Sequence, residues 1–403
     1  MLDISSSMNG SNRLTNLKTA MNEFITRVIP EDSSGPSTIS VSIIPYSMTV
    51  NPGDMISSYY DIQGKHSYSS CVFFENTAFD TLAIDVDEPL ERYSHYADGS
   101  SGYHADGTIN LPYCPDNEIL VHSTLRSELS QAVADLRGWD ATGIDIGVKW
   151  GLHLLDPSFR PVLSDLASKG DRSADLINSP GAYSSRLVKK IMVLMSDGEN
   201  DGQRDLVREE FREGPSPVWI DPDTGDYSVL VLDGRVTGSA NTNDTTSRWY
   251  HEDSDDIEAF PDLPGASVTN WEDVESEMVR MDWPDVFNVA KSTHLANKFF
   301  RTAYEQGYID QDLYDDYRRP YNNRISDAGP NGTIQRISDI CTLAKNAGVE
   351  IFGISFDPPS DAAQEVISDC ATSAAHFFPV EGLEISNAFA AIGQNISLLR
   401  LTN

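Results

Sequence analysis

The sequence is poor in basic residues, and this scarcity excludes several kinds of partner. It contains 29 Lys and Arg against 62 Asp and Glu, which gives a formal net charge of -33 at pH 7. Proteins that bind phosphate backbones need basic patches, so the composition predicts no nucleic-acid partner. The same negative charge opposes docking on an anionic membrane surface. It is typical of a protein that stays soluble in a saline environment.

The sequence also lacks the motifs of common catalytic sites. Its eight histidines are scattered without an H-E-x-x-H pair, and no G-x-x-x-x-G-K-[ST] phosphate loop occurs. Residues 353–357 lack the second glycine of a nucleophile elbow. We therefore expect a protein that is not an enzyme. A magnesium-dependent hydrolase is the weaker alternative, since Asp3, Asp140 and Asp197 could form a carboxylate cluster.

Long apolar runs are absent as well. No stretch of about 18 apolar residues occurs, so the sequence as given predicts no membrane-spanning helix, and no signal peptide is visible. Only Met1 and Leu2 precede Asp3, whereas a strand normally needs about five residues. We expect that the first strand is truncated and that an upstream stretch is missing.

Cysteine is rare, but its four copies fall into two pairs. Cys71 and Cys114 bracket one segment, while Cys341 and Cys370 flank the last strand–helix unit. None of them forms C-x-x-C, which disfavours a zinc or redox motif. The bracketing predicts two disulfides and an oxidising compartment outside the cytoplasm. Four buried free thiols are the alternative.

Three oxygen-bearing residues at the start of the chain carry the strongest functional signal. Asp3, Ser5 and Ser7 form the pattern D-x-S-x-S after a short apolar run. A strand that ends here and turns into a helix directs one carboxylate and two hydroxyls to a single point. Such oxygen ligands suit Mg²⁺, or else Ca²⁺ and Mn²⁺. The alternative is that the serines only cap a helix.

Two further loops favour the metal site over the cap. Residues 189–197 read as a buried parallel strand that ends at Asp197, beside a glycine. Residues 139–147 form a polar turn that opens an amphipathic helix and offers a third hydroxyl, that of Thr142. Ligands of parallel sheets bind at the carboxyl ends of the strands, where we expect all three loops to lie.

Strands alternate with helices along most of the chain, which predicts a Rossmann-like α/β fold with a doubly wound, mostly parallel sheet. Residues 45–46 are expected to turn away from the strand before them. We expect strands at 38–44, 188–196, 349–356 and 377–378, and helices at 14–28, 123–137, 143–155, 334–346, 360–369 and 384–399.

Two long segments do not fit this alternation and are expected to be insertions. Residues 55–113 are aromatic, polar and rich in glycine, so we expect an ordered insertion closed by its cysteines. In the second, 201–332, we expect a hairpin at 218–232 whose acidic residues form an ordinary turn rather than a calcium site. Helices are expected at 286–306 and 310–319, and a solvated loop at 251–256.

The three loops together resemble the von Willebrand factor A (vWA) family. There, a D-x-S-x-S loop, a lone Thr and an Asp before Gly build a metal-ion-dependent adhesion site (MIDAS). The resemblance implies hydroxyl ligands from Ser5, Ser7 and Thr142, and carboxylates of Asp3 and Asp197 that bind the ion directly or through its waters. Mg²⁺ is the expected ion, with Ca²⁺ or Mn²⁺ as alternatives.

Both ends of the chain and the Thr loop look like the A-type domain of TadG-like proteins, which are encoded with the tight-adherence (Flp) pilus machinery of bacteria. The resemblance implies one domain over residues 1–403, with its core at about 1–54, 114–200 and 333–403. It also implies a periplasmic or extracellular place, with membrane attachment through an upstream helix outside this chain.

The sequence thus predicts a non-enzymatic envelope protein that binds a partner's carboxylate through a divalent cation, in pilus assembly or adhesion. The expected partner is a pilus or envelope protein that offers an acidic residue. The alternative is a structural envelope protein whose metal only stabilises the loops.

Overall fold

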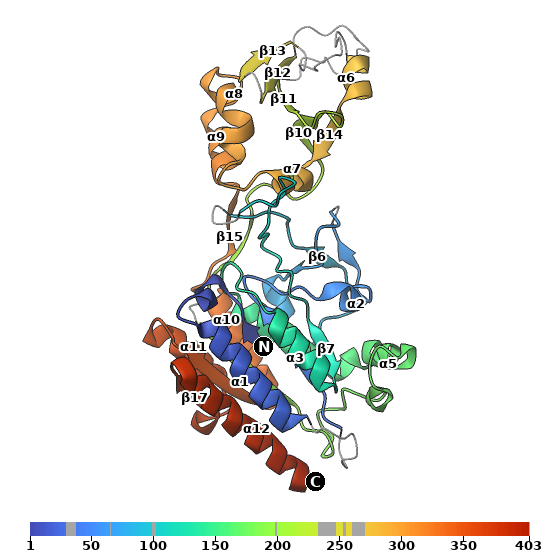
Figure 1. The fold of residues 1–403 in the computed structure, drawn as a ribbon, viewed down its shortest axis with the longest axis vertical. Helices are drawn as coiled ribbons and strands as arrows, with labels where there is room; N and C mark the ends of the chain where they lie inside the picture. The colour runs from blue at the N-terminus through green and yellow to red at the C-terminus, as the bar shows by residue number, and fades with distance from the viewer. Residues whose placement is uncertain are drawn as a thin grey trace.

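The computed structural model describes residues 1–29, 38–64, 66–98, 102–197, 200–232, 247–252, 255–259 and 271–402. The molecule is elongated, with a central sheet and its covering helices at one end and a second sheet at the other (Figure 1). None of the helices within these ranges is both long and apolar enough to cross a bilayer.

The central sheet has five strands, in the order β17-β16-β8-β1-β3. All four neighbouring pairs are parallel, and Leu2 of β1 pairs with Pro45 on one side and Met195 on the other. This sheet, with helices on both faces, confirms the α/β fold class. Its strands are β1 (Leu2–Asp3), β3 (Pro45–Tyr46), β8 (Ile191–Ser196), β16 (Glu350–Phe356) and β17 (Phe377–Val380).

Helices bury both faces of the central sheet, so its strands read as continuous apolar runs. Successive residues of β8 point to opposite faces: Leu194 joins the core under one helix layer and Met195 the core under the other. One layer comprises α1 (Arg13–Val28), α3 (Arg126–Asp135) and α12 (Ile385–Thr402). The other comprises α4 (Ile144–Leu155), α10 (Thr333–Asn346) and α11 (Asp361–Cys370). The predicted disulfide Cys341–Cys370 is confirmed and joins α10 to α11.

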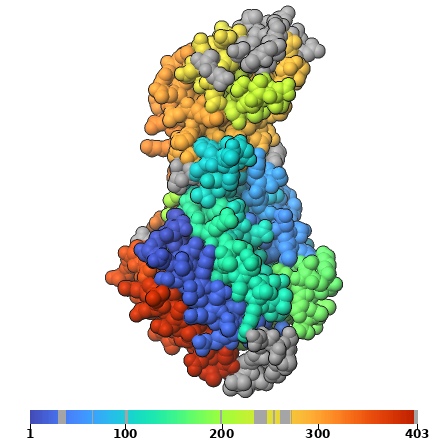
Figure 2. Space-filling model, in the orientation of Figure 1, coloured from blue at the N-terminus to red at the C-terminus, as the bar shows by residue number. Residues whose placement is uncertain are grey.

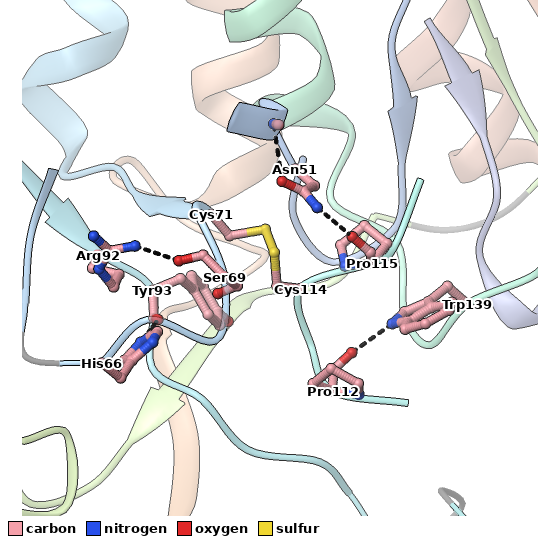
Figure 3. Close-up of a disulfide and its surroundings, with 11 residues drawn as sticks. Asn51, His66, Ser69, Cys71, Arg92, Tyr93, Pro112, Cys114, Pro115 and Trp139 are labelled. Atoms are coloured by element: carbon pink, nitrogen blue, oxygen red, sulfur yellow. Dashed lines mark hydrogen bonds between the residues drawn. A yellow bond between two sulfur atoms is a disulfide. The ribbon is translucent and has the colours of Figure 1, made fainter. Parts of the chain in front are cut away.

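The described residues of the first insertion are ordered, and the second predicted disulfide, Cys71–Cys114, closes the segment (Figure 3). Beside that bond, His66 contacts the carbonyl of Tyr93, and Arg92 donates to the carbonyl of Ser69. The strands and α-helices from residue 41 to residue 169 that are not yet named are β2 (Val41–Ile43), α2 (Gly53–Ser57), β4 (Ile62–Gln63), β5 (Val72–Phe73), β6 (Leu90–Arg92), β7 (Leu120–Ser123) and α5 (Arg160–Lys169).

The second insertion leaves the central domain through a two-stranded antiparallel ribbon, β9 (Gln203–Leu206) with β15 (Tyr321–Ile325). Beyond the ribbon lies an antiparallel sheet in the order β13-β12-β11-β10-β14. The elements of this region are β10 (Pro215–Ile220), β11 (Tyr227–Leu232), β12 (Arg248–His251), β13 (Asp256–Glu258), β14 (Val279–Asp282), α6 (Trp271–Glu277), α7 (Trp283–Val289), α8 (Arg301–Glu305) and α9 (Gln311–Arg318). The predicted hairpin is β10–β11.

The two insertions share one hydrophobic core. Tyr96 of the first stacks on Tyr113 at a centroid distance of 4.4 Å and also contacts Phe287 and Tyr321 of the second. The Cys71–Cys114 disulfide lies in the same cluster. Figure 2 shows the first insertion, in light blue and teal, between the two ends of the molecule.

Three sequence predictions about these elements are wrong. Residues 45–46 do not turn away but form β3, where the N–H groups of Leu2 and Ile4 donate to the carbonyls of Ile44 and Tyr46. Pro45 is tolerated because this edge pairing uses carbonyls next to it rather than its missing N–H.

The predicted helix 286–306 is interrupted after α7 and resumes as a π-helical turn, Ala296–Phe300, followed by α8. At the break, Ser292 N–H donates to the Ala97 carbonyl and Lys291 N–H to the Tyr103 hydroxyl, so contacts with the first insertion replace helical bonds.

The predicted solvated loop 251–256 is wrong only at its two ends, where buried His251 of β12 pairs with Asp256 of β13. Residues 252 and 255 form a turn as predicted, and residues 253–254 lie outside the described residues. At the β10–β11 turn, the Asp221 carboxylate accepts N–H groups of Asp223 and Thr224, as in an ordinary Asx turn.

Candidate metal centre

The D-x-S-x-S loop lies at the point where the central sheet reverses its strand order. From β1, the chain next enters the sheet on one side, as β3, and later on the other side, as β8. Connections that diverge in this way leave a crevice at the carboxyl ends of the two strands. Asp3 ends β1, and Asp197 directly follows β8. Residues almost two hundred positions apart therefore meet at the carboxyl ends of β1 and β8.

Asp3 is fully buried and fixed by two hydrogen bonds. Its Oδ1 accepts the Ser5 N–H at 2.8 Å, and its Oδ2 accepts the Ser196 hydroxyl at 2.7 Å. Beneath it, the buried Tyr46 hydroxyl donates to the Met195 carbonyl at 2.7 Å, which holds β3 against β8 across β1. The carboxylate therefore has one orientation, set by the first loop on one side and by β8 on the other.

The next three side chains form a continuous chain of oxygens. Ser5 Oγ lies 2.8 Å from Ser7 Oγ, and the Ser7 hydroxyl donates to Asp197 Oδ1 at 2.8 Å. Ser5 and Asp197 are buried, whereas Ser7 is exposed. Four of the five predicted site residues thus gather in one hydrogen-bonded cluster, which we call the oxygen cluster: Asp3, Ser5, Ser7 and Asp197.

The two carboxyl groups of the oxygen cluster resist ionisation. Burial raises the pKa of Asp3, and the nearby Asp197 raises it further, against hydrogen bonds from Ser5 and Ser196. Burial also raises the pKa of Asp197, against hydrogen bonds from Ser7 and Arg13. Two neighbouring carboxylates are costly in a buried place, and a cation bound by both would offset that cost.

The loop that contains Thr142 (the Thr loop, residues 139–143) is held beside the D-x-S-x-S loop by backbone hydrogen bonds, and Thr142 itself is not part of the oxygen cluster. Trp139 N–H donates to the Ile4 carbonyl at 2.6 Å, and Ser6 N–H donates to the Asp140 carbonyl at 2.7 Å. These bonds run the Thr loop alongside the first loop. The bonds of Thr142 itself go to Asp201, whose carboxylate accepts its N–H at 3.1 Å. The structure thus brings the loop of Thr142 next to the cluster and leaves its hydroxyl outside the hydrogen-bonded chain.

Gly143 shows why the Thr loop has this sequence. A Cβ at this position would lie 2.4 Å from the Met48 carbonyl oxygen. The close approach lets Gly143 N–H donate to the Ser47 carbonyl at 2.6 Å and fixes the start of α4. The side chain of Asp145, the second residue of α4, pairs with buried Arg336 at 3.2 Å and not with the oxygen cluster. Asp145 is therefore structural.

Sequence reasoning missed Arg13, which contacts the oxygen cluster, and Asp357, which contacts Arg13. Arg13 Nη1 lies 3.0 Å from Asp197 Oδ2, and Arg13 Nε lies 3.2 Å from Asp357 Oδ2. Asp357 directly follows β16, so the rule that polar residues at strand ends meet could have identified it. For Arg13 no comparable signal exists, because it reads as an ordinary first residue of a helix.

The donor set fits Mg²⁺. Neighbouring ligands of an octahedral Mg²⁺ lie about 3 Å apart, because each metal–oxygen distance is ~2.1 Å. The separations Ser5–Ser7 and Ser7–Asp197, 2.8 Å each, match such an edge. Within the described ranges, no group of three or more His, Cys, Asp and Glu side chains could hold a metal ion. A site here would therefore depend on hydroxyl ligands as well as carboxylates.

Comparisons with known proteins identify remote similarity only. No protein-family model and no curated protein sequence matches the chain. Among solved structures, the vWF domain of the type V pili tip protein Mfa5 from Porphyromonas gingivalis is similar over 98% of this chain and 93% of that one, with 15% identity and a TM-score of 0.38. The pilus adhesin SpaC from Lactobacillus rhamnosus GG matches 98% of this chain and 29% of its own, with 13% identity and a TM-score of 0.35.

Both insertions are attached to the Thr loop, which runs beside the first loop. The Trp139 indole donates to the Pro112 carbonyl, near Cys114 (Figure 3). On the other side, Asp201 bonds to Thr142 and leads into β9, the first strand of the ribbon. Both insertions are thus connected to the Thr loop.

Proposed function

We propose that this protein is a non-enzymatic adhesion or assembly factor of the cell envelope that binds a partner's carboxylate through a divalent cation, Mg²⁺ in the first place. The observation that carries the proposal is the oxygen cluster at the carboxyl ends of β1 and β8. Ser5 and Ser7 would hold the ion with their hydroxyls, and Asp3 and Asp197 directly or through water. Thr142 would complete the site after a local adjustment of its loop.

The chemistry follows from the neutrality of the hydroxyl ligands. An ion held mainly by neutral oxygens keeps enough electrophilicity to accept a carboxylate oxygen of another protein. The chain's own part is to fix Asp3 and to hold the Ser5 and Ser7 hydroxyls at ligand spacing. The two insertions, which are attached to the Thr loop beside the site, would supply specificity.

The place in the cell envelope is supported by the two disulfides, since such bonds persist in oxidising compartments. We propose a periplasmic or extracellular location and a pilus or envelope protein as partner. The TadG-like family, the tight-adherence pilus and attachment through an upstream helix remain predictions from the sequence.

Thermal melting of the oxidised 403-residue protein with EDTA, Mg²⁺, Ca²⁺ or Mn²⁺ tests the metal site. We expect a higher melting temperature with metal in the wild type and no metal effect in Asp3→Ala and Ser5→Ala. Asp339→Ala and Ser168→Ala, at exposed positions, serve as matched controls, and metal should raise their melting temperature as it does in the wild type. A wild type that does not respond to any of the three ions would refute the proposal.

The adhesive step needs a second measurement. The metal-loaded protein should bind a pool of immobilised Asp-containing peptides more strongly than the same pool with Asn, and EDTA should abolish the difference. Metal stabilisation without any preference for Asp would favour the structural alternative, in which the ion only holds the loops.

A further inference from the structure

Arg13 occupies an unusual place beside the oxygen cluster. It is the first residue of α1, and the two residues before it, Ser11 and Asn12, have left-handed backbones with φ of 51° and 60°. This turn carries the side chain back over the first loop, where Nη1 also lies 3.4 Å from the Ser7 carbonyl. A cation at a helix N-terminus is disfavoured by the helix dipole, so its ion pairs must hold it there.

Asp197 is the deeper of the two partners of Arg13. Its side chain is fully buried, while that of Arg13 is 23% exposed. The two oxygens of Asp197 are divided between the oxygen cluster and the guanidinium: Oδ1 accepts from Ser7 and Oδ2 accepts from Arg13. The positive charge of Arg13 therefore neutralises the same carboxylate that the proposed metal would use.

Asp357 is the second and more exposed partner. Its own position is fixed, because its Oδ1 accepts the Gly382 N–H at 2.9 Å and its N–H donates to the Val380 carbonyl at 2.9 Å. Arg13 Nη2 also donates to the Asp357 carbonyl at 3.3 Å. Asp357 thus provides two acceptors on which the guanidinium could remain if it released Asp197.

We propose that Arg13 is a built-in counter-ion of the metal centre: it holds Asp197 while no divalent ion is bound and is displaced onto Asp357 when one binds. This inference rests on the proposed metal site and concerns its regulation. It makes the guanidinium a competitor of the ion, so the affinity of the site depends on a residue that is not a ligand.

Magnesium titration by calorimetry, together with melting in EDTA, tests this role. Loss of the guanidinium charge in Arg13→Gln removes like-charge repulsion at the site and should tighten Mg²⁺ binding by about tenfold. The same substitution should lower the melting temperature in EDTA, because buried Asp197 loses its cation. Arg13→Lys keeps the charge and is the matched control, with an affinity close to that of the wild type.

Asp357→Asn should act in the opposite direction, because it removes the charged acceptor to which Arg13 retreats. We expect several-fold weaker Mg²⁺ binding in this variant. In the double variant with Arg13→Gln, the Asn substitution should change the affinity little. If it weakened binding as much as in the wild-type background, Asp357 would act on the ion without Arg13, which would overturn the proposal.

The outcomes separate this inference from the proposed function. A wild type that binds none of Mg²⁺, Ca²⁺ and Mn²⁺ overturns both. A wild type that binds Mg²⁺ while Arg13→Gln binds it equally or more weakly overturns only the counter-ion role. If Arg13→Gln fails to fold, Asp357→Asn alone decides, and an unchanged affinity there contradicts the proposal.

Discussion

The Ser7 hydroxyl donates to Asp197 Oδ1 at 2.8 Å, although 190 positions separate the two residues in the chain. The bond connects the loop after β1 to the loop after β8, the two strands between which the sheet reverses its order. It brings a hydroxyl of the D-x-S-x-S pattern into contact with the carboxylate of Asp197, in the loop after β8. A metal that bound here would replace this bond, with Ser7 held to the ion by its hydroxyl and Asp197 directly or through water.

The first prediction concerns the buried carboxyl of Asp3. Asp3→Asn should raise the melting temperature in EDTA at pH 8, because it removes a buried charge next to Asp197 while the amide can still bond Ser5 and Ser196. The same variant should lose metal stabilisation. Since the pKa of Asp3 is raised in the folded state, its ionisation costs stability as pH rises, so the gain over the wild type should shrink in acid. A variant less stable than the wild type in EDTA at pH 8 would contradict this account.

The second prediction separates an adhesive metal from a structural one. Thr142→Ala removes the hydroxyl and the γ-methyl group, but it keeps both bonds to Asp201, because these use only the N–H and the carbonyl of Thr142. We expect a loss of Asp-peptide binding with a loss of stability below about 1 kcal/mol, as for a side chain outside the hydrogen-bonded core. Thr142→Ser, which keeps the hydroxyl, is the matched control. A fall in melting temperature that parallels the fall in binding would favour the structural alternative.

The third prediction concerns the loss of stability at low pH through two histidines at the contact between the two insertions. His66 and His95 lie with ring centroids 5.9 Å apart, and His95 contacts Asn288 of α7. Burial lowers the pKa of each to about 4, from an ordinary 6.5; Arg92 also lowers the pKa of His66, while Asp285 opposes both shifts.

Between pH 6.5 and 4 the unfolded chain therefore binds more protons at these histidines, so stability falls as pH falls through this window. At pH 4, the lower end of this window, the free energy of unfolding is reduced by on the order of 3 kcal/mol per histidine. His66→Gln and His95→Gln should each reduce the difference in melting temperature between pH 7 and pH 4.5. Carboxyls with raised pKa act in the opposite direction, so the comparison with the wild type is the informative one. An unchanged pH dependence in both variants would exclude this role.

The fourth prediction compares the two disulfides. Cys71–Cys114 and Cys341–Cys370 close 43 and 29 positions, for which chain entropy gives about 4 kcal/mol each. Their replacement by serine pairs should therefore lower stability to a similar extent. Only the Cys71–Cys114 pair lies near Pro112, which holds Trp139 of the Thr loop. We expect weaker metal binding in that variant alone; equal effects on metal affinity would argue against a link between the first insertion and the site.

Much of the central sheet and of its covering helices could be predicted from the sequence, because the apolar patterns that indicate these strands and helices are local. The run at 191–196 is apolar on both faces and therefore forms a central strand, and the apolar spacing in 14–28 forms α1. The place of Asp3 and Asp197 follows from the same logic, since the carboxyl ends of parallel strands share one edge. The disulfides were predictable because each cysteine pair brackets one segment.

The insertions were less predictable because long-range contacts decide their structure. The break after α7 depends on bonds from Ser292 and Lys291 to the first insertion, which no local pattern reveals. Outside the insertions, the strand of the central sheet at Pro45–Tyr46 also depends on a long-range contact, its pairing with β1, rather than on its own composition.

For the candidate site, the sequence by itself determined which oxygens lie at the ends of β1 and β8, because these residues directly follow apolar runs. Only the tertiary structure decided that Ser5, Ser7 and Asp197 form one hydrogen-bonded chain, that Thr142 stays outside it, and that Arg13 pairs with Asp197 and Asp357. The physical reason is that hydrogen bonds and ion pairs depend on distances of about 3 Å. Such distances are set by the packing of segments far apart in the chain, and not by the order of residues within any one of them.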